Sequence, residues 1–463
     1  MIDYIKLLLA LFLPLFVGYV LTCIIMPKKE DISEIERLAL SYLIGTGTFT
    51  LLIFMLGAFG IGFSLFNIIT ATGIMLALPV IIAVKNKSLM LDLKSFKFAR
   101  LKWLEVLFLA LILSRVSFVL FEDLIKPVFS VDAFANWSLR AKVFFFDSGL
   151  SMRTKDLYFA GGGQPFYPIN IPLMETWIAK VLGYWNDQLF KVIFGLFLIS
   201  LLTIFYCSVR RFASRPVSLV STYLLSTLPL LVHHATIEYA DFPLCVYIAC
   251  SVFFLLNYFE SNQEKHLYFS SMLAGIGAWT KSEGMSLLLV NIVVICVYLI
   301  RNNRDMRYMA AKLGGYLLLA LTFKVPWSVF NVYYNIPKSI WQKIEYTKMF
   351  ENSYRIPVIM DQFYRKLFFY GNWNIAWFVF FAALIISFRS LNKTRYLYSL
   401  LQIILVMSAF AFLYYITPSY EWLLDGTTLN RNILIIMPVV IYFISLSISD
   451  ILSSRQKKAE NVR

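Results

Sequence analysis

The sequence predicts an all-α integral membrane protein that crosses the bilayer many times, and three observations carry this prediction. Of its 463 residues, 59% are hydrophobic and only 15% are charged, whereas soluble domains are about half apolar and about a quarter charged. The mean hydropathy is +0.71. Apolar runs long enough to span a bilayer recur along the chain and are separated by short links rich in Lys and Arg.

The apolar runs set the number of membrane crossings, because a spanning helix needs about 20 apolar residues. Hydropathy predicts about 13 spans. They lie near residues 4–26, 37–58, 64–84, 103–121, 187–208, 217–234, 241–258, 266–280, 285–300, 308–332, 373–388, 396–417 and 431–449. The first run is too long for a signal-peptide core and is read as a span. The short pair 266–280 and 285–300 also fits a tilted or re-entrant hairpin.

The links between the spans predict topology and organisation. Basic residues gather in links that fall on one side, which the positive-inside rule assigns to the cytoplasm. The N-terminus then lies outside and the C-terminus inside. We expect three regions: an N-terminal three-helix membrane segment (1–102), a membrane core with a long outer loop at 122–186 (103–332), and a second outer loop with the last membrane helices (333–463).

Charge and cysteine usage narrow the function classes. The net charge of +15 reflects these basic links, so no nucleic-acid partner is predicted. All five cysteines lie inside apolar runs without a CxxC pair, which is typical of buried core residues. The adjacent His233 and His234 would point apart on a helix, so no metal site is predicted.

The long outer loop contains two stretches with amphipathic helical spacing, 134–146 and 169–182. We expect both helices to lie along the membrane surface with their apolar faces in lipid. Asp132 directly precedes the first one, where a carboxylate would be held at the boundary between water and lipid. Its simpler role would be that of a helix N-cap.

Other charged residues lie at the outer ends of predicted spans. Glu238 and Asp241 share a face if the turn that they occupy is helical, and they either bind a ligand or cap the seventh span. Lys281 and Glu283 lie between two apolar runs, where charge indicates function unless the turn is simply exposed. Arg431 opens the last span, where it suits a phosphate or snorkels to the interface.

In their order and topology these pieces resemble the GT-C glycosyltransferases, polytopic membrane enzymes that use polyprenyl-phosphate sugars as donors. The resemblance covers roughly residues 103 to 440 and is carried by five elements. They are the acidic opening of the outer loop at Asp132, the stretch Gln164-Pro-Phe-Tyr-Pro168, Glu238-Tyr-Ala-Asp241, Ala278-Trp-Thr-Lys-Ser-Glu-Gly284, and the late Arg431. Gln164 stands where a histidine is more usual, and the first three spans depart from the family core.

The resemblance implies direct transfer of a sugar from a polyprenyl-phosphate donor to an acceptor hydroxyl, with Asp132 as general base. A carboxylate is a weak base, so it would act by being well placed. Arg431 and Lys281 would stabilise the leaving phosphate. Glu238, Asp241, Glu283 and Tyr167 would bind the substrates. No cofactor or metal is carried over, because members of the family differ on this point.

The partners implied are the lipid-linked donor, membrane lipid, and a glycan, lipid or protein acceptor. The site would face the periplasmic or extracellular side of a bacterial inner membrane. A transporter of lipid-linked sugars is an alternative, but it would need a polar path to the cytoplasm. A polysaccharide polymerase or ligase is another. Its chemistry rests on arginine and histidine in a large outer loop, and the large outer loops of this chain contain no histidine.

Overall fold

The computed structural model describes residues 1–27, 32–89, 100–150, 164–337 and 343–461, and their regular structure is helical throughout. Ten helices of this part of the chain are long and apolar enough to cross a membrane. They are α1 (Ile2–Ile25), α2 (Glu34–Ala58), α3 (Leu65–Lys85), α4 (Trp103–Ile125), α8 (Val192–Arg210), α11 (Asp241–Ser261), α13 (Gly284–Arg301), α14 (Met306–Tyr333), α17 (Thr394–Ile416) and α19 (Leu429–Asn461). The chain is an integral membrane protein, as the sequence predicted.

The predicted count of about 13 spans is not confirmed, because three of the predicted runs form shorter helices. The run 217–234 is divided into α9 (Arg215–Ser226) and α10 (Pro229–His234), as expected where a proline disfavours helix in the residue before it. The run 266–280 belongs to α12 (Glu264–Thr280), and the run 373–388 contains only α16 (Ala376–Ile386).

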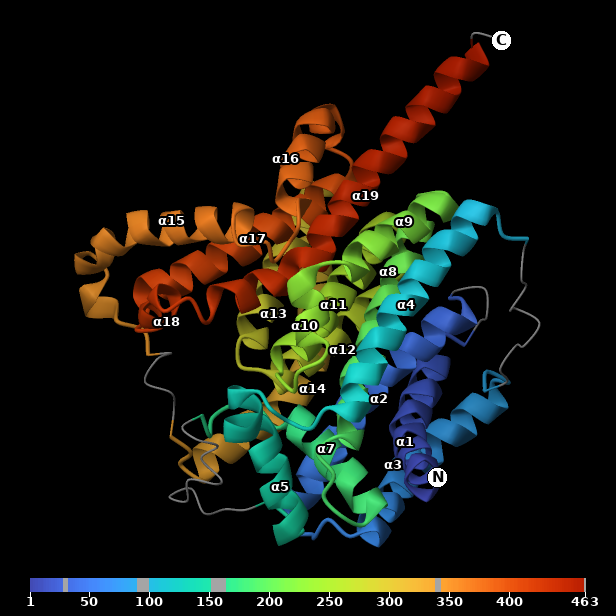
Figure 1. The fold of residues 1–463 in the computed structure, drawn as a ribbon, viewed down its shortest axis with the longest axis vertical. Coiled ribbons are helices and arrows are strands. Elements are labelled where there is room, and N and C mark those ends of the chain that lie inside the picture. The colour runs from blue at the N-terminus through green and yellow to red at the C-terminus, as the bar shows by residue number, and fades with distance from the viewer. Residues whose placement is uncertain (28–31, 90–99, 151–163, 338–342, 462–463) are drawn as a thin grey trace.

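Successive helices alternate in direction, so the links fall at two opposite ends of the bundle (Figure 1). The N-terminus lies at the end that carries the long outer loop, because the Tyr184 hydroxyl bonds to the Asp3 carboxylate at 3.0 Å. At the opposite end, ion pairs join the basic links to helix starts, as between Arg211 and Glu36 at 2.7 Å. The two chain ends therefore lie at opposite ends of the bundle. Which end faces the cytoplasm stays a prediction, and the basic link at 90–99 lies outside the described residues.

Helix α11 forms the centre of the bundle and is buried along its spanning length (Figure 1). A polar network lies within this apolar core. The Asn291 side chain of α13 donates to the Ser251 hydroxyl of α11 and to the Tyr316 hydroxyl of α14, each at 3.0 Å. Gln402 of α17 donates to the Asn291 oxygen at 2.8 Å. Because every link joins different helices, the network ties four of them together.

Helices α1 and α2 pack unusually closely. A Cβ atom on Gly18 would lie 1.8 Å from the Ser41 carbonyl oxygen, and one on Gly45 would lie 1.9 Å from that of Pro14. Only glycine allows backbones to approach this far, which is a common device of membrane helix pairs.

Two helices form in the described part of the outer loop. A π-helical turn (Ala133–Trp137) leads into α5 (Ser138–Asp147), and α7 spans Asn170–Leu182. Their apolar faces pack on protein, which differs from the expected position in lipid. Most of α7 is buried, and its Trp177 donates to the Ala10 carbonyl of α1 at 2.8 Å. The α5 residues Ala141 and Phe144 are buried too, and α5 packs against α7.

The second outer segment carries α15 (Arg355–Phe368) and is followed by α16, α17 and the short α18 (Tyr420–Leu424). Helix α15 lies beside α17 at the left of the bundle, away from α11 (Figure 1). The three predicted regions of the chain stay a prediction.

Candidate active site

A cavity of about 1260 Å³ lies at the end of the bundle that carries the outer loop. The π-helical turn, the residues before α7, the start of α11, the link between α12 and α13, and the link into α19 all contribute to its wall. Six of the seven predicted site residues line it: Asp132, Tyr167, Asp241, Lys281, Glu283 and Arg431. The cations of the described wall are Lys281 and Arg431.

Asp132 and Arg431 form an ion pair, although 299 positions separate them in the chain. Arg431 Nη1 lies 2.5 Å from Asp132 Oδ2. Asp132 precedes the π-helical turn, but its carboxylate makes no capping hydrogen bond, so the N-cap alternative is wrong. The carboxylate is instead held in the cavity wall.

Tyr239 fixes both partners of this pair. Its hydroxyl accepts a hydrogen bond from the Asp132 backbone N–H at 3.3 Å. The Arg431 guanidinium lies over its ring, 4.8 Å from the centroid, which favours the cation. In the sequence this tyrosine stands out only as a spacer between Glu238 and Asp241.

Lys281 joins two carboxylates. Its Nζ lies 2.8 Å from Asp241 Oδ1 and 3.2 Å from Glu283 Oε1, and the three side chains meet where α11, α12 and α13 begin or end. Burial opposes the charged amine, but the two carboxylates outweigh it and raise the pKa of Lys281 above its ordinary value. The lysine is therefore a cation in this site.

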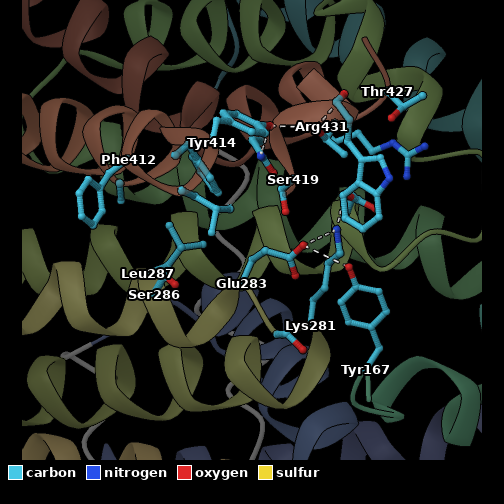
Figure 2. A pocket seen from close by; sticks show the side chains of 18 of the residues that line it. Tyr167, Lys281, Glu283, Ser286, Leu287, Phe412, Tyr414, Ser419, Thr427 and Arg431 are labelled. Carbon is cyan, nitrogen blue, oxygen red and sulfur yellow. Dashed lines mark hydrogen bonds and ion pairs between the residues drawn. The ribbon is translucent and has the colours of Figure 1, made fainter. Parts of the chain in front are cut away.

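Tyr167 points toward the same group (Figure 2). Its hydroxyl donates to Glu283 Oε1 at 3.5 Å, and its ring lies against Trp137 with centroids 5.4 Å apart. Burial, followed by the nearby Glu283 carboxylate, raises the pKa of the Tyr167 hydroxyl, which keeps it a neutral donor.

Arg140 is a residue of the site that sequence reasoning missed. This buried side chain of α5 donates to the Tyr167 carbonyl at 2.7 Å and to the Gln164 carbonyl at 2.6 Å. The planar fork of an arginine suits such a pair of acceptors. Arg140 thus fixes the chain segment that presents Tyr167 to the cavity.

Glu238 does not reach the cavity wall. Residues 238 and 239 are not helical, so the helical turn that would have put Glu238 and Asp241 on one face is absent. Glu238 instead lies 2.7 Å from the Lys191 ammonium, and both side chains are fully buried. Burial raises the pKa of Glu238, and Lys191 opposes this effect.

The far part of the cavity is apolar and opens on the side of the bundle, between α13 and α17. Leu289 and Val293 of α13 line it and are 51% and 46% exposed, and Phe412 of α17 is 51% exposed. Such side chains face lipid in a spanning helix. The cavity therefore joins a charged end to an apolar opening on the side of the bundle.

A metal site is not evident in the described residues, among which no group of three His, Cys, Asp or Glu side chains is placed to hold an ion. The rings of His233 and His234 meet edge to face, with centroids 5.7 Å apart. That the sequence indicates no metal, while leaving room for a divalent cation, stays a prediction.

Comparisons with known proteins agree with this description. Residues 170–330, which run from α7 into α14, match the model of the dolichyl-phosphate-mannose-protein mannosyltransferase family. The match contains Asp241, Lys281 and Glu283 but excludes Asp132 and Arg431. A search of curated proteins finds no significant match.

Two solved structures share the fold, both of ArnT from Cupriavidus metallidurans. One is bound to undecaprenyl phosphate, with a TM-score of 0.52 and 14% identity. The other is the apo state, with a TM-score of 0.51 and 16% identity. Each alignment covers 74% of this chain and 59% of the ArnT chain, so this chain matches about three fifths of that protein. The predicted likeness to GT-C enzymes is confirmed at the level of the fold.

Proposed function

We propose that this protein is a membrane glycosyltransferase that moves a sugar from a polyprenyl-phosphate donor to an acceptor hydroxyl. The observation that carries the proposal is the cavity, which joins Arg431 and Lys281 to an apolar opening between α13 and α17. A polyprenyl-phosphate sugar has the same two-part chemistry, an anionic head on a long apolar chain.

The charged end supplies the groups that such a transfer needs. Asp132 takes the proton of the acceptor hydroxyl while the oxygen of that hydroxyl attacks the anomeric carbon of the donor sugar. The bond between that carbon and the phosphate oxygen breaks, and polyprenyl phosphate leaves with the electron pair. Arg431 meets the charge on the phosphate with its planar fork, and Lys281 adds a second positive charge.

The remaining predicted site residues hold this arrangement. Asp241 and Glu283 fix Lys281, and Tyr167 presents its hydroxyl to Glu283. For Glu238 we propose an indirect role, because its ion pair with Lys191 anchors the segment that carries Tyr239 and Asp241. No cofactor is part of the proposal.

The comparisons support the donor class without identifying the sugar. One ArnT structure holds undecaprenyl phosphate, and the matching family is described by a dolichyl-phosphate sugar. By analogy we place the protein in a bacterial inner membrane with its site on the periplasmic side. The acceptor is a glycan, a lipid or a protein.

A transporter of lipid-linked sugars is a weaker candidate. Asp241, Glu283 and Arg431 all lie at or close to helix starts, so the charges gather at one end of the bundle. A transporter would instead place them along a path near the middle of the membrane. No specific observation favours the polymerase or ligase alternative.

Loss of the proposed base tests the function. We expect Asp132→Asn to reduce sugar transfer from a radiolabelled polyprenyl-phosphate sugar pool in membranes by about 100-fold or more, the usual size of general-base catalysis. Asp361→Asn is a matched control, because Asp361 pairs with Arg365 on exposed α15, outside the cavity. Transfer by Asp132→Asn at the wild-type rate would exclude the base. Absence of transfer by the wild type with every donor would favour a transporter.

A further inference from the structure

The first turn of α19 carries Arg431, the arginine proposed to meet the donor phosphate. The backbone N–H of Asn432 donates to the Thr428 carbonyl at 3.0 Å and closes this turn. Because the ends of helices fray, a side chain that extends from a first turn stays in one place only if the turn is supported by other parts of the fold. The support for this turn comes from the end of α17.

Tyr414 of α17 connects the two ends of the turn. The hydroxyl of this buried residue accepts a hydrogen bond from the Asn432 side-chain amide at 2.7 Å and lies 3.0 Å from the Thr428 hydroxyl. The Thr428 hydroxyl also donates to the Trp422 carbonyl of α18 at 3.2 Å. Arg431 lies between Thr428 and Asn432 in the chain, and Tyr414 is on the same side of the cavity as Arg431 (Figure 2).

The chemistry of these groups gives their hydrogen bonds one direction. An amide N–H only donates and a backbone carbonyl only accepts, whereas a hydroxyl can do both. Since the Thr428 proton goes to the Trp422 carbonyl, the Tyr414 proton goes to the Thr428 oxygen. The result is a chain of three hydrogen bonds that runs from Asn432 through Tyr414 and Thr428 to α18. Both hydroxyls donate and accept, so the chain holds the turn of α19 against α17 and α18.

Arg431 depends on this support most when a donor arrives. Its guanidinium contacts the Asp132 carboxylate and the Tyr239 ring. A phosphate that displaces Asp132 removes one of these contacts, so the direction of the arginine side chain then depends more on the turn from which it extends. Groups that bind a ligand are kept in position by hydrogen bonds among neighbours that need not touch the ligand.

We propose that Tyr414 is a positioning residue, which through Thr428 and Asn432 holds Arg431 where it meets the donor phosphate. This inference rests on the proposed function. It concerns the tyrosine hydroxyl, because the ring packs in the cavity wall with or without that group. Tyr414→Phe therefore interrupts the chain of hydrogen bonds and keeps the ring.

The test compares a charged lipid with an uncharged one. Full-length wild type and variants are placed in nanodiscs, and binding is measured for polyprenyl phosphate and for polyprenol of the same length, which lacks the phosphate. We expect Tyr414→Phe to bind polyprenyl phosphate about five- to tenfold more weakly, on the order of the loss of one hydrogen bond. Its affinity for polyprenol should stay within about twofold of wild type, since Arg431 has no phosphate to meet there.

Tyr247→Phe is the matched control. Tyr247 is a buried tyrosine of α11 whose hydroxyl donates to the Leu43 carbonyl at 3.0 Å, and it lies outside the cavity wall. This variant also loses one buried hydrogen bond and should leave both affinities unchanged.

Thr428→Val breaks the same chain of hydrogen bonds at its next member. We expect it to reproduce the effect of Tyr414→Phe, and the double variant to lose no more affinity than either single one, because both changes interrupt one chain. If Thr428→Val leaves the affinity for polyprenyl phosphate unchanged while Tyr414→Phe lowers it, the tyrosine hydroxyl contacts the lipid itself and the positioning role is overturned.

Two other results would overturn the inference and leave the proposed function standing. Equal weakening of both lipids by Tyr414→Phe would mean that the tyrosine supports the cavity wall as a whole. Unchanged binding of polyprenyl phosphate would mean that the turn holds Arg431 without it. A wild type that binds polyprenyl phosphate no more tightly than polyprenol would instead overturn the phosphate site on which the proposed function depends.

Discussion

At the scale of single residues, Asp132 and Arg431 form an ion pair. The proposed base and the arginine proposed to bind the phosphate therefore neutralise each other when no donor is bound. A donor phosphate would have to compete with Asp132 for the guanidinium. Once the phosphate takes Arg431, the Asp132 carboxylate becomes free to accept a proton. On the proposed function, the pair would therefore link activation of the proposed base to arrival of the donor.

This competition predicts an unusual binding result. We expect Asp132→Asn to bind sugar-free polyprenyl phosphate several-fold more tightly than wild type, because the neutral amide competes less well for Arg431. Fluorescence or calorimetric titration in nanodiscs measures the affinity, with Asp361→Asn as the matched control. An affinity equal to wild type, or a weaker one, would contradict competition between the carboxylate and the phosphate.

The same scale shows where sequence reasoning succeeds and where it does not. Charged residues in apolar surroundings stand out, so Asp132, Lys281 and Arg431 could be selected from the amino-acid sequence alone. Glu238 also stood out, but it lies in an irregular segment and turns to Lys191. Its partner is 47 positions away, so spacing along the chain could not reveal it.

Arg140 could have been found from its own pattern. It lies three residues after Trp137 and four before Phe144, on the face of α5 that is otherwise apolar and buried. An arginine on such a face needs acceptors. Which carbonyls it meets depends on the packing of α5 against the segment before α7, and that packing is not encoded locally.

At the scale of elements, long apolar helices were predictable and broken or short ones were not. Hydropathy treats 217–234 as one run, but Pro229 ends α9 early and begins α10. The amphipathic helices of the outer loop were expected in lipid because one face is apolar. Periodicity identifies such a face but not what covers it, and in α7 the cover is α1, α2 and α5.

The network around Asn291 predicts a specific loss of stability. Asn291→Leu removes the acceptor of Gln402 and the donor to Ser251 and Tyr316, which leaves buried polar groups unpaired. We expect the free energy of unfolding in micelles to fall by about 1–3 kcal/mol. Denaturant titration followed by tryptophan fluorescence measures it.

Asn257 of α11 provides the contrast. Its side chain is buried, and neither amide atom has a partner among the described residues. We expect Asn257→Leu to leave stability unchanged or to raise it, since no hydrogen bond is lost. Equal destabilisation by both substitutions would show that the size of the side chain, and not the network, sets the stability.

At the scale of the whole molecule, the fold brings distant parts of the chain to one end of the bundle and leaves a side opening there. The opening between α13 and α17 predicts that a bulky residue will obstruct the lipid chain. We expect Val293→Trp to lower the affinity for a long-chain polyprenyl phosphate by about tenfold and to affect a short-chain analogue much less.

The control for this prediction lies on the same helix. Val297 is one turn further along α13 and is 37% exposed, but it lies outside the cavity wall. Val297→Trp should leave both affinities unchanged. Equal losses for the long and short lipids with Val293→Trp would show that the apolar part of the cavity does not hold the chain.

The side opening also determines which measure of substrate concentration is relevant for this protein. A substrate that enters from between the helices is drawn from the surrounding bilayer, so its supply is set by its mole fraction among lipids and by diffusion in two dimensions. Adding inert lipid at constant total substrate would then slow the reaction, although the number of molecules per litre is the same. The rate of sugar transfer would thus follow the composition of the membrane.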